Sequence, residues 1–288
     1  MSFGSELQSN FHRLTQNHFF NEEVLFAKLD DAFILMKKDP RFMRHIDIIH
    51  GDISKIKIDL SYDPVFGKPI IRELADMLFI LISKNEMRLL YLQNKRQSEL
   101  KSYLCFNAEY GQFQLLKERP HIEPAFRKGL PACVFNNKDI LCDAILPSVC
   151  SYGVFYCSNG GVNMCYFPAS QLSVSGIKKP TGKRMHVDCK LEFDSKFGFV
   201  DTIHGHLESQ GEKNLESFGN ALIEMTVGTP VNCSMRSQVF DYLSFYSENH
   251  NNPNNLFLGC KTVIVIHTDN LAECNSKKND WSKRNYEF

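Results

Sequence analysis

The sequence lacks any long hydrophobic run, and no window approaches about eighteen consecutive apolar residues, so we expect no membrane span. It also lacks a basic N-terminal region followed by an apolar stretch, so we expect no secretion by a signal peptide. Charge of one sign is not in excess, because 33 basic and 33 acidic side chains balance. A net charge of zero argues against a protein that coats nucleic acid through bulk positive charge.

Paired cysteine motifs are missing as well. The chain has 10 cysteines but no Cys-x-x-Cys pair. We therefore expect reduced thiols that pack as small apolar side chains in a cytoplasmic protein. A zinc site is the weaker alternative, because an HxxC and an HxH segment without a second matched pair make a poor ligand signature. Its candidate ligands are His186, Cys189, His204 and His206.

Helix and strand patterns alternate along the chain, which indicates a mixed α/β fold. Residues 21–38 repeat apolar side chains with a helical period, with Asn21 as the N-cap and Asp39-Pro40 as the end. We expect apolar strands over residues 56–60, 74–82 and 87–92. Further helices are expected over 108–117, 215–226 and 236–247, and further strands over 154–167, 185–208 and 256–267.

No internal repeat and no long linker divides the sequence. We interpret residues 1–125 as a core and residues 126–288 as an α+β portion that packs on this core or completes it. The segments 178–184 and 249–255 and the tail after Asn275 are expected to be loops.

Asp76 is the most informative residue, because it interrupts the apolar segment LADMLFILI. A charge inside such a strand costs several kcal/mol unless it is paired or bound to a metal. If strands 74–82 and 87–92 form a hairpin centred near Asn85, Asp76 lies beside position 94. Gln93 and Lys95 are two apart and then share one face.

A carboxylate, an amide and an ammonium group in one cluster suit phosphodiester hydrolysis. Carboxylate oxygens hold Mg²⁺, and the metal activates a water while the lysine orients it. Glu73 and Glu23 are candidates for further oxygen ligands. The alternative is a simple buried salt bridge from Asp76 to Lys95 or Arg96.

Asp76 followed by Gln93-Asn94-Lys95 resembles the D…(D/E)xK signature of the PD-(D/E)xK nuclease superfamily. The QxK form is similar to that of Mrr-like restriction enzymes, and the resemblance covers about residues 15 to 120. It departs from the pattern in Ala75, which stands where the signature has proline. It implies a restriction-endonuclease-like mixed sheet flanked by helices.

The resemblance also implies roles for individual residues. Asp76 is the metal ligand, Gln93 takes the place of the second acid, Lys95 is the catalytic lysine and Glu23 is the helix-borne acid. The implied cofactor is Mg²⁺ or Mn²⁺. The implied activity is cleavage of nucleic acid, DNA in the first place, in restriction or anti-phage defence.

Two further expectations concern partners and activity. A homodimer or a complex with another defence protein is in keeping with such enzymes. Because Gln93 is neutral, the alternative function is an inactive nuclease-like scaffold that acts through a partner.

A local surplus of positive charge offers candidate contacts to nucleic acid. Residues 101–200 hold 12 basic and 8 acidic side chains. Such side chains contact phosphates. The candidates are Arg96, Lys178, Lys179, Lys183 and Arg184, of which the last four lie on or beside a Gly/Pro loop.

Overall fold

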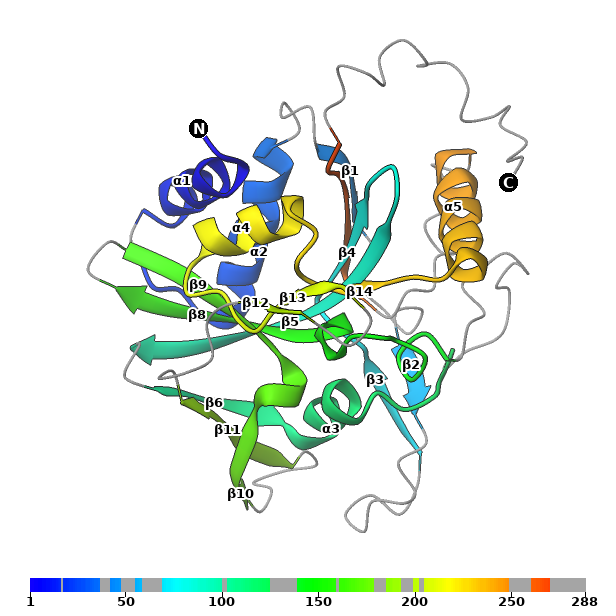
Figure 1. Ribbon diagram of the computed structural model, residues 1–288. Helices are drawn as coiled ribbons and strands as arrows, with labels where there is room; N and C mark the ends of the chain where they lie inside the picture. The colour runs from blue at the N-terminus through cyan, green and yellow to red at the C-terminus, as the bar shows by residue number, and fades with distance from the viewer. Residues whose placement is uncertain are drawn as a thin grey trace.

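A computed structural model gives the fold of the chain (Figure 1). The described residues are 1–16, 18–36, 42–47, 55–58, 69–99, 103–124, 139–158, 161–178, 185–192, 199–201, 205–248 and 260–269. The predicted loop at 178–184 lies outside them except for Lys178, which ends a strand. The predicted loop at 249–255 and the tail also lie outside them. No helix in these ranges is long and apolar enough to cross a membrane.

The main sheet is mixed, with strand order β1-β15-β4-β5-β8-β9. Its strands are β1 (Phe42–Asp47), β4 (Met77–Ile82), β5 (Met87–Glu99), β8 (Cys150–Ser158), β9 (Gly161–Pro168) and β15 (Thr262–His267). The short β14 (Thr229–Pro230) pairs with β5. Strand β4 is parallel to β15 and antiparallel to β5, and β5 is parallel to β8. The predicted α/β class is therefore confirmed.

The sheet combines strands from both sides of residue 125. Strands β4 and β5 precede that position, and β8, β9 and β15 follow it. All six residues of β4 are buried, as expected for a central strand that is covered on both faces. The C-terminal part of the chain thus supplies neighbours for both central strands.

Three helices cover one face of the main sheet (Figure 1). They are α1 (Phe3–Thr15), α2 (Glu22–Leu35) and α4 (Leu215–Ile223). The ring of Phe79 on β4 packs edge-on against Phe33 of α2 and Phe218 of α4, with centroids 5.3 Å and 5.8 Å away. This aromatic cluster ties the helices to the centre of the sheet.

The other face packs against a second layer of mixed structure. It includes α3 (Tyr110–Glu118), α5 (Cys233–Glu248) and two three-stranded sheets. One of these sheets contains β6 (Tyr103–Glu109), β10 (Ser173–Lys178) and β11 (His186–Glu192), and the other contains β2 (Lys55–Ile58), β3 (Ile70–Glu73) and β7 (Ile122–Pro124). A separate pair is β12 (Phe199–Asp201) with β13 (Leu207–Ser209), and short 3₁₀ turns lie at Pro147–Val149 and Ala169–Gln171.

Helix α2 begins where the sequence predicts it. Asn21 caps it, and its side chain accepts a hydrogen bond from the backbone N–H of Val24 at 2.9 Å. The described helix ends at Leu35, and the predicted Asp39-Pro40 end lies outside the described residues. Helix α1 is not among the predicted elements, although the sequence holds two signals for it. Ser2 caps its N-terminus, and the buried residues Phe3, Leu7 and Phe11 recur at helical spacing.

The β4–β5 hairpin is offset by one residue from the expected register. Met77 pairs with Leu92, and continuing this register places Asp76 opposite Gln93 instead of position 94. Strand β5 also runs on to Glu99, so Gln93 and Lys95 lie within the strand and not beyond its end. The predicted hairpin over 154–167 is confirmed as β8–β9.

Candidate functional site

Asp76 directly precedes β4 and is a buried residue with 5% of its surface exposed. Its Oδ2 accepts hydrogen bonds from Nε2 of Gln93 at 2.6 Å and from the backbone N–H of Asn94 at 2.9 Å. Its Oδ1 lies 2.7 Å from Nζ of Lys261. Both oxygens are thus engaged, which offsets the cost of burying the charge.

Lys261 belongs to the site, although no motif in the sequence marks it. It directly precedes β15, and its backbone N–H donates to the carbonyl oxygen of Asp76 at 2.9 Å. Its Nζ also lies 3.8 Å from Oε2 of Glu73 and 5.4 Å from the centre of the Phe26 ring. Two strands that start side by side therefore bring an acid and a base together.

The surroundings of Lys261 keep it charged. Burial alone would lower the pKa of its ammonium group, but the carboxylates of Asp76, Glu73 and Glu22 together raise that pKa above its ordinary value of 10.5. Glu73, Asp76 and Glu22, from β3, the start of β4 and α2, are thus close enough to act on one cation.

Lys95 forms an ion pair with Glu22 in the first turn of α2, with Nζ 2.8 Å from Oε1. The lysine side chain is 13% exposed and the glutamate side chain 40%. Of the two adjacent glutamates of α2, Glu22 and not the predicted Glu23 contacts Lys95. Glu23 is exposed and forms no hydrogen bond or ion pair with any described residue, because it points about 100° away around the helix.

Gln93 connects the carboxylate to helix α3. Its amide nitrogen faces Asp76, and its Oε1 accepts a hydrogen bond from Nε2 of Gln112. Gln112 lies on α3. Here it fixes the orientation of the Gln93 amide.

The predicted salt bridge from Asp76 to Lys95 or Arg96 is not found among the described residues, since Asp76 pairs with Lys261 instead. Arg96 is exposed, and its guanidinium lies 4.1 Å from the centre of the Phe19 ring. Lys178 ends β10, and nothing is described of its side chain. Lys179, Lys183 and Arg184 lie outside the described residues.

The weaker zinc alternative is not assembled as the spacing suggested. His186 and Cys189 lie three positions apart on β11, which places them on opposite faces of the strand. His206 lies 3.5 Å from the carboxylate of Glu86, and His204 lies outside the described residues.

Comparison with known proteins gives no relative: no protein-family model, no curated protein and no solved structure matches the chain. The site itself offers three carboxylates, two ammonium groups and two carboxamides. Carboxylate and amide oxygens are the donors that Mg²⁺ takes in proteins, so the donor set fits this ion in kind.

Proposed function

We propose that this protein is a Mg²⁺-dependent endonuclease, active also with Mn²⁺, that hydrolyses phosphodiester bonds in DNA. The observation that carries the proposal is the convergence of Glu22, Asp76, Gln93 and Lys95 from α2, the start of β4 and β5. A restriction-endonuclease-like core and a role in restriction or anti-phage defence belong to the same proposal. They rest on the resemblance of the Asp76 and Gln93-x-Lys95 pattern to such enzymes.

Each residue has a distinct task in this proposal. Asp76, Glu73 and Glu22 would hold the ion, which supplies charge for the phosphate and lowers the pKa of an attacking water. Rotation of the Gln93 amide would turn its oxygen towards Asp76 and add a neutral oxygen donor. Lys95 keeps its ammonium beside Glu22, where it can orient the water and offset phosphate charge.

The test is cleavage of plasmid, linear duplex and single-stranded DNA, with RNA in parallel, in the presence of Mg²⁺ or Mn²⁺. The parent should cut DNA, and Asp76→Asn and Lys95→Ala should each lower the rate at least about 100-fold. Lys28→Ala is the matched control, because Lys28 lies on α2 in an exposed pair with Asp31. Full activity in both site variants would refute the proposal, provided that circular dichroism shows all variants folded.

The second candidate is an inactive nuclease-like scaffold that acts through a partner. Two observations favour it. Protein donors already satisfy both oxygens of Asp76. Among the described residues, the carboxylates of Glu22, Glu73 and Asp76 also do not all lie within 4.8 Å of one another, as the ligands of one metal ion would. Calorimetric titration with Mn²⁺ separates the two candidates. A nuclease should bind Mn²⁺ and lose this binding in Asp76→Asn, whereas the inactive scaffold should give the same result in the parent and in Asp76→Asn.

A further inference from the structure

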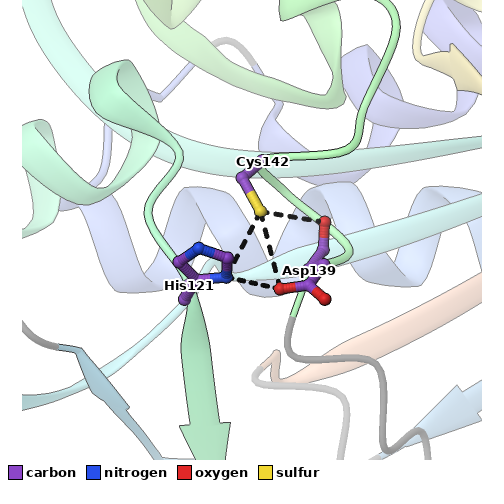
Figure 2. Close-up of side chains that lie close together, drawn as sticks. All are labelled: His121, Asp139 and Cys142. Atoms are coloured by element: carbon purple, nitrogen blue, oxygen red, sulfur yellow. Dashed lines mark hydrogen bonds and ion pairs between the residues drawn. The ribbon is translucent and has the colours of Figure 1, made fainter.

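A second group of chemically reactive side chains lies away from Asp76, where the chain leaves α3 and where it approaches β8. Figure 2 shows His121, Asp139 and Cys142 pointing towards one another. One donor atom from each lies within 4.8 Å of the other two. The Cys142 Sγ is 3.5 Å from Nδ1 of His121 and 3.8 Å from Oδ1 of Asp139, and this Nδ1 and Oδ1 are also paired.

The two segments are held in place by contacts outside the cluster. In the turn, the backbone N–H of Asp143 donates to the carbonyl oxygen of Asp139 at 2.8 Å. Ile140 and Leu141 of the same turn are buried in the core. The guanidinium of Arg119, two residues before His121, donates to the carbonyl oxygen of Ala144 at 3.1 Å. The three donors are thus presented by fixed backbone.

The arrangement does not suit a nucleophilic cysteine. In a Cys-His-Asp relay, the thiol and the carboxylate face opposite nitrogens of the imidazole ring. Here both face Nδ1 of His121. Burial together with the charges of Asp139 and Asp143 also raises the pKa of the Cys142 thiol, which disfavours the reactive thiolate.

We propose that His121, Asp139 and Cys142 form a Zn²⁺ site. Three donors that converge on one point are what a metal ion needs, whereas a relay needs them in series. Tetrahedral Zn²⁺ with ordinary bond lengths separates its sulfur, nitrogen and oxygen ligands by about 3.4–3.6 Å. The sulfur–nitrogen distance of 3.5 Å agrees with this value, and the sulfur–oxygen distance of 3.8 Å needs only a small adjustment. Nδ1 of His121 and Oδ1 of Asp139 are in direct contact without the ion, so these two atoms must move apart when it binds.

The donor types select the metal. Thiolate and imidazole favour Zn²⁺, whereas Mg²⁺ takes oxygen donors and keeps most of its waters. The three side chains are all at least partly exposed, so water completes the coordination. Binding deprotonates the thiol, and the charge of the ion offsets the repulsion between the resulting thiolate and the Asp139 carboxylate.

The ion would join the segment after α3 to the turn before β8. This crosslink closes the chain between residues 121 and 139, so Zn²⁺ should raise the melting temperature of the protein. The site is independent of the proposed nuclease centre, and neither proposal needs the other.

The test uses the full chain with Zn²⁺ or Co²⁺ in an excess of Mg²⁺. The parent should bind one Zn²⁺ in competition with a chromogenic chelator, and Co²⁺ should give the near-ultraviolet absorption of a metal–thiolate bond. Cys142→Ser and His121→Asn should each weaken Zn²⁺ binding at least about 10-fold and abolish or perturb the cobalt spectrum. The parent should gain more thermal stability with Zn²⁺ than Cys142→Ser or His121→Asn does.

Two variants serve as controls. Cys233→Ser removes another exposed thiol, on α5, and should leave Zn²⁺ binding unchanged. Asp76→Asn should also leave it unchanged, which separates this site from the nuclease centre. Equal Zn²⁺ affinity in the parent, Cys142→Ser and His121→Asn would overturn the proposal, and so would a cobalt complex without thiolate absorption.

Discussion

The ammonium of Lys261 lies 2.7 Å from Oδ1 of Asp76, and the pair joins the starts of the parallel strands β15 and β4. The aspartate side chain is 7% exposed and the lysine side chain 25%. The pair explains how a charge can sit beside the most apolar strand of the sheet without a metal. It also places a positive charge where an ion bound to Asp76 would have to compete with it.

Lys261→Met should therefore have two opposite effects. Without metal it should lower the free energy of unfolding by about 1–3 kcal/mol, because Asp76 loses a charged partner. With Mg²⁺ it should show a larger rise in melting temperature than the parent, because Asp76 and Glu73 no longer share a protein cation. Thermal unfolding with and without Mg²⁺ measures both effects.

The control for this comparison is Lys28→Met, which removes a partly exposed lysine from a pair with the exposed Asp31 at an N–O distance of 3.9 Å. It should behave as the parent does in both conditions, since exposed pairs contribute little. An equal Mg²⁺ response in Lys261→Met and the parent would count against metal binding at Asp76.

The adjacent glutamates at the start of α2 give a second prediction. Glu22→Gln should lower cleavage by about 10-fold or more, because it removes the charge that holds Lys95 and an oxygen ligand of the proposed site. Glu23→Gln changes the same charge at the same helix end but on an exposed side chain, and it should leave the rate unchanged. Initial rates of DNA cleavage at one Mg²⁺ concentration compare the two variants. An equal loss of rate in both variants would contradict a specific role of Glu22, because the charge at the start of α2 would then be all that matters.

Local signals in the sequence were sufficient for part of this structure. The capped helix α2, the buried strand β4 and the β8–β9 hairpin follow from capping, periodicity and turn residues within each segment. The meeting of Asp76 with Gln93 followed from counting along a hairpin. A register error of one residue did not prevent it, because both side chains lie at the same end of the strands.

The rest depended on information that local patterns do not contain. Lys261 reaches Asp76 because β15 pairs in parallel with β4, and such a pairing is set by packing between distant parts of the chain. The choice between Glu22 and Glu23 depends on the rotation of α2 about its axis. The His121, Asp139 and Cys142 cluster has no regular spacing, because a turn and the end of a helix bring it together.

Glu212 provides a prediction about pH. Burial raises the pKa of its carboxyl above the ordinary value of 4.5, and hydrogen bonds from Ser209 and Ser217 offset this only in part. The native state therefore holds this proton more tightly than the unfolded chain does. Its contribution to stability is complete below pH 4.5 and is lost as the pH rises through the native pKa.

Glu212→Gln keeps an oxygen that can accept the Ser209 hydrogen bond and removes the charge. Relative to the parent, this variant should therefore gain stability as the pH rises above 4.5, and it should not gain stability below that pH. Urea unfolding at a series of pH values measures the difference, with Glu118→Gln, an exposed residue at the end of α3, as the control. A difference that does not vary with pH would contradict the assignment.

The contact between α1 and α4 requires glycine on both helices. A Cβ built on Gly4 would lie 1.8 Å from the carbonyl oxygen of Glu216, and one on Gly219 would lie 2.6 Å from Cα of Gly4. The backbone N–H of Gly4 also donates to Oδ1 of Asn220 at 3.0 Å, which fixes the two helices at this separation. A methyl group at either position must therefore force the helices apart.

Gly4→Ala and Gly219→Ala should each lower the free energy of unfolding by about 1–3 kcal/mol, although alanine favours a helix more than glycine does. Gly176→Ala on β10 is the control, because a Cβ there meets nothing within 4 Å, and its effect should stay within about 0.5 kcal/mol. The midpoint of urea unfolding measures all three. If the helix variants matched the control, α1 and α4 would have to be free to separate. The contact of Phe218 with Phe79 would then not be holding α4 at a fixed distance from the sheet.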